Sequence, residues 1–211
     1  MKLNKSSIIR GKRRLVADDI TAVFPRKRRI GLLGRPGPKK IFLKMLAGAV
    51  PQDSGIIDKK GNISFPIGYS GSFHKELTGV QNVRFVARIY GVDCNELIDY
   101  VKKFTELGRF INSPVASYNS DMMSKLAFGV SMGIPFSYYL INEMTSVGDK
   151  HFKKKCRPIM EDRLKRNGAI IVSNKSAKLR MYCSSGAILK KGRLILFDDI
   201  NDAINVYSQN K

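Results

Sequence analysis

The stretch Arg29-Ile-Gly-Leu-Leu-Gly-Arg-Pro-Gly-Pro-Lys-Lys-Ile41 decides the fold class of this chain. Its apolar residues 30–33 predict a buried strand, its glycines and prolines predict a turn, and the residues that follow predict a helix. This order is the setting of a phosphate-binding loop with the pattern G-x-x-x-x-G-K-[ST]. Gly34 and Lys40 match the pattern, whereas Lys39 stands at its second glycine and Ile41 at its Ser/Thr.

The chemistry of this loop is altered at several positions. Phosphate is normally held by consecutive backbone N–H groups and by the N-terminus of the following helix. Two prolines remove N–H groups, and the lysine at the second glycine adds a side chain where the backbone must turn tightly. The loop is therefore either a weak, electrostatic phosphate site or a turn that has lost its binding role. Its candidate nucleotide-contacting residues are Gly34, Arg35, Pro36, Gly37, Pro38, Lys39, Lys40 and Ile41.

The chain is strongly basic, with 38 Lys and Arg against 17 Asp and Glu among 211 residues and a net charge of +21. Such a charge attracts nucleic acid, anionic lipid or nucleotide phosphates, or is simply a solvated surface. No nucleic-acid recognition motif accompanies the charge, so no specific nucleic acid is expected as a partner. No apolar run approaches the ~20 residues of a membrane-spanning helix, and a secretory signal is not expected. The three cysteines lack metal-ligand spacing and are expected to be free thiols.

Short apolar strands alternate with helical patterns along the chain, which predicts an α/β fold with a mainly parallel sheet. Between residues 74 and 135 the strand patterns vanish and helices dominate. We therefore expect an α/β core formed by residues 1–73 and 136–211, with a helical subdomain at 74–135. The first strand of the core looks abbreviated to residues 1–5. The other expected strands are 30–33, 63–67, 138–141, 169–173, 187–189 and 194–197, and the expected helices are 83–90, 97–108, 152–160 and 200–207.

Four further segments carry a family resemblance over nearly the whole chain. They are Pro51-Gln-Asp-Ser-Gly-Ile56, the stretch 68–90, Tyr118-Asn-Ser-Asp-Met-Met-Ser-Lys-Leu-Ala-Phe-Gly-Val-Ser-Met132 and the stretch 138–149. With the loop at 34–41, they resemble the ATP-binding subunit of an ABC transporter of the capsular-polysaccharide exporter subfamily. The resemblance implies a P-loop NTPase (ABC ATPase) core, a dimer that sandwiches ATP, and a polytopic membrane subunit as partner. It also implies export of a lipid-linked polysaccharide and a peripheral position on the cytoplasmic face of the inner membrane.

In this family an Asp at the end of the Walker B strand holds Mg²⁺, and the following Glu polarises the attacking water. This chain has Asn142 at the first position and Glu143 at the second, so Glu143 is the candidate catalytic base. Ile41 cannot ligate Mg²⁺, which prefers oxygen ligands, and Asn142 removes a negative charge. We therefore name no metal ligand, and Mg²⁺ as a cofactor is in doubt.

Three more family positions are changed or retained. Ser120 of the signature motif remains to contact ATP across the dimer, and Asp149 is the candidate dimer contact. Asp121 either places a carboxylate beside that phosphate or caps a helix starting at Met122. Asn174 stands where the family has a histidine, and an amide cannot carry a proton.

The resemblance predicts the nucleotide-binding subunit of a capsule exporter, with ATP binding weak or lost and hydrolysis absent or very slow. Two alternatives remain open. The first is a non-catalytic pseudo-ATPase that docks on a membrane subunit. The second is a basic binder of nucleic acid or anionic membrane that uses the same fold.

Overall fold

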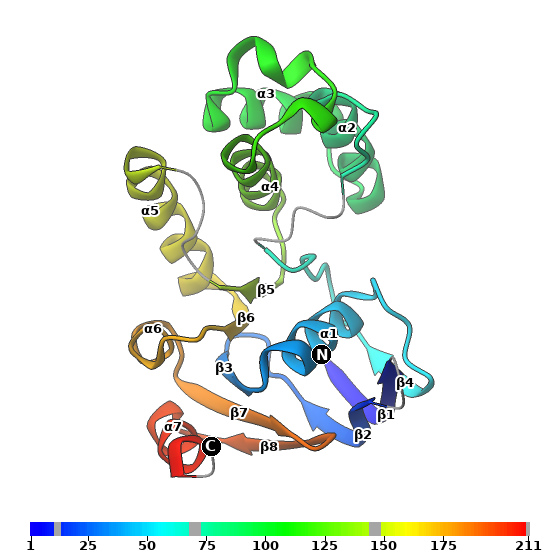
Figure 1. Ribbon diagram of the computed structural model, residues 1–211, viewed down its shortest axis with the longest axis vertical. Helices are drawn as coiled ribbons and strands as arrows, with labels where there is room; N and C mark the ends of the chain where they lie inside the picture. The colour runs from blue at the N-terminus through cyan, green and yellow to red at the C-terminus, as the bar shows by residue number, and fades with distance from the viewer. Residues whose placement is uncertain (11–13, 68–72, 144–148, 210–211) are drawn as a thin grey trace. The chain divides into compact units, whose positions relative to one another are not determined.

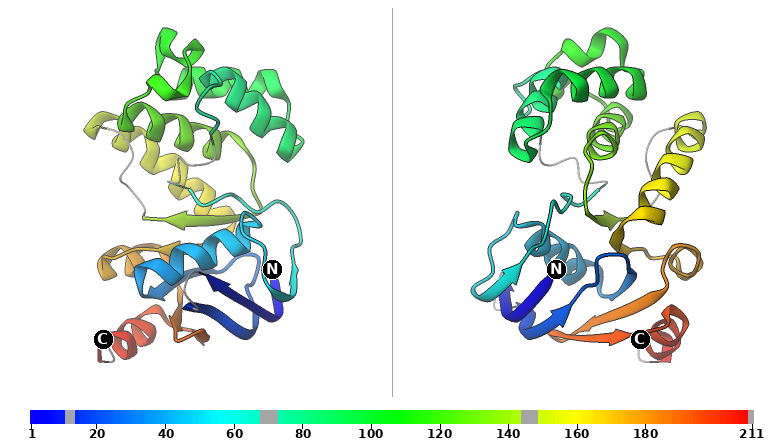
Figure 2. Two further views of the ribbon diagram at one scale, coloured as in Figure 1. Left: turned by 45° about the vertical axis from the view of Figure 1, so that its right-hand side comes forward. Right: turned by 180° about the vertical axis from the view of Figure 1, so that it is seen from behind.

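The protein is described by a computed structural model that covers residues 1–10, 14–67, 73–143 and 149–209 (Figures 1 and 2). The chain forms two compact units. The first contains Met1–Pro66, Phe136–Met144 and Leu164–Lys211, and the second contains Ile67–Pro135 and Thr145–Arg163. The second unit thus adds residues 67–73 and 145–163 to the expected helical subdomain at 74–135.

The first unit is built around a five-stranded sheet in the order β5-β6-β3-β7-β8. The first four strands are parallel, and β8 runs antiparallel to β7. The strands β5, β6 and β3 are apolar almost throughout because both faces of this part of the sheet are buried. The expected α/β core with a mainly parallel sheet is therefore confirmed. The strand bounds are β3 Arg29–Gly34, β5 Tyr138–Asn142, β6 Gly168–Val172, β7 Ser185–Lys190 and β8 Arg193–Phe197.

Helix α1, Pro36–Ala47, follows β3 directly and packs against β3 and β5. Its side chains Phe42, Leu43, Met45 and Leu46 are fully buried in the main apolar core of the unit. The helix ends at Gly48, which adopts the left-handed conformation favoured by glycine at this position. Two further helices of this unit are α6, Ser176–Tyr182, and α7, Ile200–Gln209, and α7 packs on β7 and β3.

A second, three-stranded sheet of the first unit was not predicted from the sequence. Its order is β2-β1-β4, and both pairs are antiparallel. The prediction that the first strand is abbreviated to residues 1–5 is wrong. Strand β1 extends over Lys2–Arg10 and pairs with β2, Arg14–Val23, and with β4, Ser54–Asp58. Conversely, the expected strand at 63–67 is represented by an isolated bridge between Ile63 and Tyr138. Pro66 has no N–H for a ladder, which disfavours a regular strand there.

The second unit is helical in its described residues. Thr78 forms a capping box with Gln81 at the start of α2, and the Asp93 side chain caps α3. Helix α3 ends at Thr105 rather than at Gly108, because Glu106 adopts a left-handed conformation with φ 55°. The bounds are α2 Gly79–Tyr90, α3 Cys94–Thr105, α4 Ser120–Gly133 and α5 Lys150–Arg166, with 3₁₀ turns at Gly108–Asn112 and Val115–Ser117.

An aromatic cluster joins α5 to the rest of the helical unit. Phe152, 1% exposed, has its ring centroid 5.3 Å from that of Phe104 and 6.3 Å from that of Phe128. Both pairs are edge-on, the geometry that aromatic quadrupoles favour. Phe152 therefore belongs to the hydrophobic core of the second unit.

Candidate functional site

The start of α1 differs from a phosphate-binding loop. Strand β3 ends at Gly34 and α1 begins at Pro36, so that Arg35 alone separates the strand from the helix. Proline suits the first helical position because its fixed φ matches the helix, and the N–H of Lys39 already bonds to the carbonyl of Arg35 at 3.3 Å. The N–H groups at positions 35–38 have no acceptor within the helix, and two of these four residues are prolines, which have no N–H. The sequence here forms a helical first turn instead of a loop wrapped around phosphate.

Gly34 is required by the fold itself. Its φ is 137°, and a Cβ added to it would lie 2.4 Å from the carbonyl oxygen of Leu189 on β7. In contrast, a Cβ added to Gly37 would meet nothing within 4 Å. The first glycine of the motif is therefore explained by backbone packing, whereas the space beside Gly37 at the start of α1 is open.

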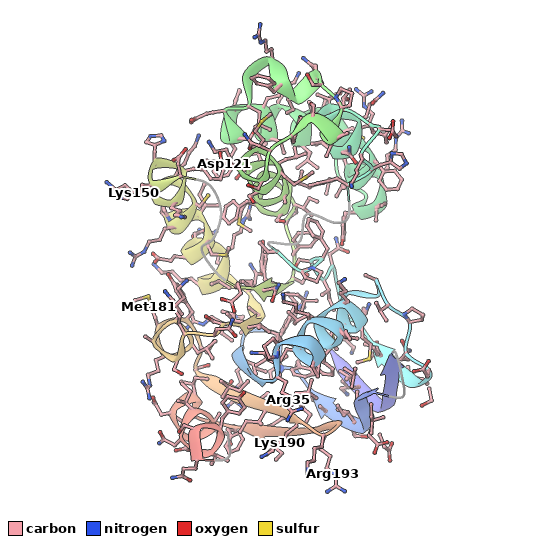
Figure 3. All side chains as sticks on the ribbon, viewed as in Figure 1. Arg35, Asp121, Lys150, Met181, Lys190 and Arg193 are labelled. Carbon is pink, nitrogen blue, oxygen red and sulfur yellow. The ribbon has the colours of Figure 1, made fainter. Side chains whose placement is uncertain are left out.

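The two lysines of the motif have different environments. Lys39 is only 3% exposed, whereas Lys40, to which the sequence assigned the phosphate contact, is exposed. Burial lowers the pKa of Lys39, and the negative charge of Glu143 acts in the opposite direction. Arg35 is also exposed (Figure 3). Of the two lysines, Lys39 is thus the one whose pKa is affected by the charge of Glu143.

The two positions expected to hold Mg²⁺ do not fit a metal. Ile41 is half-buried and packs against the apolar core of the unit. The Asn142 Oδ1 atom is buried and has no hydrogen-bond partner among the described residues. Mg²⁺ prefers an octahedral set of oxygen ligands that includes carboxylates, and these positions offer one neutral amide oxygen. In the described ranges no group of three or more His, Cys, Asp or Glu side chains could hold a metal ion.

Glu143 connects the ends of β5 and β6. Its N–H donates to the carbonyl of Val172 at 2.9 Å, and its Oε1 accepts a hydrogen bond of 2.9 Å from the N–H of Asn174. Its φ of 58° is uncommon for a residue with a side chain. The candidate base therefore accepts a hydrogen bond from the backbone of Asn174, a contact that the sequence did not predict.

The signature segment lies at the start of α4 in the second unit. Asn119 caps the helix by accepting the N–H of Met122 at 2.9 Å, and Ser120 is the first helical residue. The expectation that Asp121 caps a helix starting at Met122 is therefore wrong. Asp121 Oδ2 instead lies 3.2 Å from Lys125 Nζ. The spacing of four residues between this acid and base was the signal available in the sequence.

Asp149 lies beside the same lysine. Its Oδ2 is 3.2 Å from Lys125 Nζ, and its Oδ1 accepts the N–H of Phe152 at 2.8 Å at the start of α5. The N–H of Phe152 and the Lys125 ammonium together hold the pKa of Asp149 below its usual range. The residue expected at a dimer contact thus has a structural role at the start of α5. Residues 68–72 and 144–148, which belong to the stretches 68–90 and 138–149 of the family resemblance, lie outside the described residues.

No helix in the described part of the chain is long and apolar enough to cross a membrane. No protein-family model matches the chain. The polysialic acid transport ATP-binding protein KpsT of Escherichia coli is 39% identical over 202 residues, covering 94% of this chain and 92% of the relative. The capsule polysaccharide export ATP-binding protein CtrD of Neisseria meningitidis serogroup B is 38% identical over 200 residues, with coverage of 92% and 91%. The ATP-binding protein BexA of Haemophilus influenzae is 34% identical over 197 residues, with coverage of 93% and 91%.

Solved structures show the same fold. An ATP-binding subunit of an ABC transporter superposes with a TM-score of 0.79 at 20% identity, covering 98% of this chain and 92% of the other. The dimeric ATP-binding cassette MJ0796, bound to ADP and Pi in a post-hydrolysis state, gives 0.71 at 14% identity, covering 92% and 97%. The expected ABC ATPase fold is thereby confirmed. The chain belongs to the family of ATP-binding proteins of ABC transporters that export capsule polysaccharides.

Proposed function

We propose that this chain is the nucleotide-binding subunit of a capsular-polysaccharide ABC exporter in which ATP hydrolysis is absent or very slow. The names of three relatives at 34–39% identity support the transport role. One observation carries the loss of hydrolysis: both metal positions of the fold lack a ligand suited to Mg²⁺, since Ile41 packs into the core and Asn142 is a neutral amide. Phosphoryl transfer depends on that metal to neutralise the charge that develops on the phosphate oxygens.

Glu143 alone does not restore catalysis. A general base must approach the water whose proton it takes, within about 2.6–3.2 Å. The Oε1 atom of Glu143 accepts the N–H of Asn174 at 2.9 Å, which leaves Oε2 to accept from a water, and Asn174 cannot act as a proton carrier. A carboxylate without a metal-bound phosphate beside it activates water poorly, so a hydrolysis rate near zero is expected.

The proposed partners are a second nucleotide-binding subunit and a polytopic membrane subunit. The dimeric state of MJ0796 supports the first. In the helical unit, Phe85 and Ile89 are 55% and 60% exposed and lie four residues apart on α2, hence on one face of the helix. Large apolar side chains exposed together are typical of an interaction surface. With a membrane partner, the subunit would be peripheral on the cytoplasmic face of the inner membrane.

A phosphate-release assay on the purified chain tests the proposal. Wild type and Glu143→Gln, purified identically, are compared with ATP in Mg²⁺ and in EDTA, so that any contaminating ATPase contributes equally to both proteins. We expect no Mg²⁺-dependent release by the wild type above that of the variant. Mg²⁺-dependent turnover in the wild type that disappears in Glu143→Gln would refute the proposed loss of hydrolysis.

A pseudo-ATPase that binds no nucleotide is the second candidate. It is favoured by the helical first turn at Pro36, which replaces the phosphate-wrapping loop. Co-purification with a membrane subunit while equilibrium dialysis detects no bound ATP would support this second candidate. Binding of ATP without turnover would support the first.

A further inference from the structure

We propose that the Lys39 side chain is a built-in cation of the nucleotide site, so that the phosphates of ATP bind at the start of α1 without a divalent metal ion. This inference rests on the proposed function, because it assumes that the chain binds nucleotide. Lys39 stands at the second glycine of the motif. We assign to its ammonium the binding of phosphate, which the loop pattern gives to backbone N–H groups and to the lysine at position 40.

The first argument is the position of Lys39. The residue lies in the first turn of α1, a helix that packs against β3 and β5, and it is 3% exposed. Within the described residues its ammonium forms no ion pair and no hydrogen bond. Burial disfavours the charged form of Lys39, and an anion placed beside the ammonium favours that form. The site therefore gains from an anionic ligand.

The second argument is that a divalent cation is disfavoured here. Glu143 is the acidic residue whose field reaches Lys39, and its Oε1 already accepts the N–H of Asn174. The Asn142 Oδ1 atom contributes only a neutral oxygen. A divalent ion would face the positive charge of Lys39 across this poor ligand set, and the two charges repel. The ammonium supplies positive charge to the site without needing those ligands.

The third argument is that other positive groups lie at the start of α1. Exposed Arg35 precedes the helix, and a guanidinium matches the geometry of phosphate oxygens. The helix N-terminus adds partial positive charge. Lys39, Arg35 and the helix start together replace the charge that a metal provides elsewhere.

Equilibrium dialysis with radiolabelled ATP tests this inference, each protein being measured in EDTA and in Mg²⁺. Lys40→Met is the matched control for Lys39→Met, because both remove one lysine charge from adjacent positions of the same turn and only Lys39 is buried. For the wild type we expect dissociation constants equal within about twofold in the two buffers. We expect Lys39→Met to weaken binding in EDTA by about tenfold or more, and Lys40→Met by less than about threefold.

Three results would overturn the inference: wild-type binding that requires Mg²⁺, equal losses in the two variants, or absence of wild-type binding in both buffers. In the last case, binding by Lys39→Gly would mean that Lys39 blocks the site. Lys39→Arg keeps the charge and should retain metal-free binding, which covers the case in which Lys39→Met fails to fold. The phosphate-release assay remains separate, since metal-free binding with measurable turnover would contradict the proposed loss of hydrolysis and leave this inference standing.

Discussion

The Lys125 ammonium lies 3.2 Å from the Asp149 carboxylate and so joins α4 to the start of α5. The same ammonium lies 3.2 Å from Asp121 Oδ2. Asp121 stands in the signature segment, where a carboxylate beside phosphate would be repulsive. Because Lys125 pairs with it, much of that repulsion is offset within the helical unit. The fold thus accommodates an acidic residue in the signature segment.

The charge of Asp149 should stabilise the protein at neutral pH and not in acid. Its pKa in the folded protein lies below the ordinary value of 3.8, so its contribution is complete above that value and is lost as the pH falls through the lower folded-state pKa. We expect Asp149→Asn to lower the midpoint of thermal unfolding at pH 7 and to reduce the loss of stability between about pH 5 and about pH 3. Asparagine also caps helices well, so this variant isolates the charge. Identical pH profiles for the two proteins would show that the charge makes no contribution.

Replacing Gly34 by alanine should destabilise the fold even without nucleotide. The new Cβ would lie 2.4 Å from the Leu189 carbonyl oxygen, and φ 137° is strained for any side chain. We expect a loss of about 3 kcal/mol or more in the free energy of unfolding, measured by urea denaturation. Gly37→Ala is the control, and it should be neutral or stabilise by about 0.5–1 kcal/mol because its Cβ meets nothing. Equal effects at the two glycines would contradict this explanation of Gly34.

Removing the ring of Phe152 should detach α5 from the aromatic cluster. The side chain is 1% exposed and contacts the rings of Phe104 and Phe128 edge-on. Truncation to alanine is expected to cost about 3–5 kcal/mol in unfolding free energy. Phe85→Ala removes an equal ring that is 55% exposed and should change stability by less than about 0.5 kcal/mol. Thermal unfolding followed by circular dichroism measures the stability of the two variants.

Restoring three motif positions should restore dependence on Mg²⁺. The combination Lys39→Gly, Ile41→Ser and Asn142→Asp supplies a hydroxyl and a carboxylate for the metal and removes the competing ammonium. For this variant we expect ATP to raise the unfolding temperature more in Mg²⁺ than in EDTA. The reason is that a ligand bound more tightly to the folded state stabilises that state more. Ile41→Ser alone should show no such increase. A triple variant indifferent to Mg²⁺ would indicate that the helical start at Pro36 prevents a metal site by itself.

The exposed face of α2 should bind the membrane subunit. Phe85→Ser with Ile89→Ser removes both apolar side chains and is expected to reduce co-purification with the membrane subunit of the same export system about tenfold or more. Stability should be little affected, since both side chains are more than half exposed. Ile195→Ser, at a 51% exposed residue of β8 in the other unit, is the control. Unchanged co-purification of the α2 variant would exclude this face as the docking surface.

The sequence by itself determined the framework of the first unit. The apolar runs at 30–33, 138–141 and 169–173 became β3, β5 and β6, because strands buried on both faces need apolar residues at consecutive positions. The loop pattern at 34–41 and the four segments 51–56, 68–90, 118–132 and 138–149 together indicated the family. The residue changes at Ile41 and Asn142 were likewise visible without coordinates, since the chemical nature of a ligand is a property of the residue type.

The tertiary structure decided what depends on distant partners. Strand β1 is rich in polar and basic residues, and it forms because β2 and β4 supply hydrogen bonds on both sides. The Glu143–Asn174 and Lys125–Asp149 contacts join residues 31 and 24 positions apart, which no local periodicity reveals. Nor does the sequence show that Lys39 is buried and Lys40 exposed, because adjacent helical residues differ by about 100° in direction and the packing of α1 selects which one faces inward.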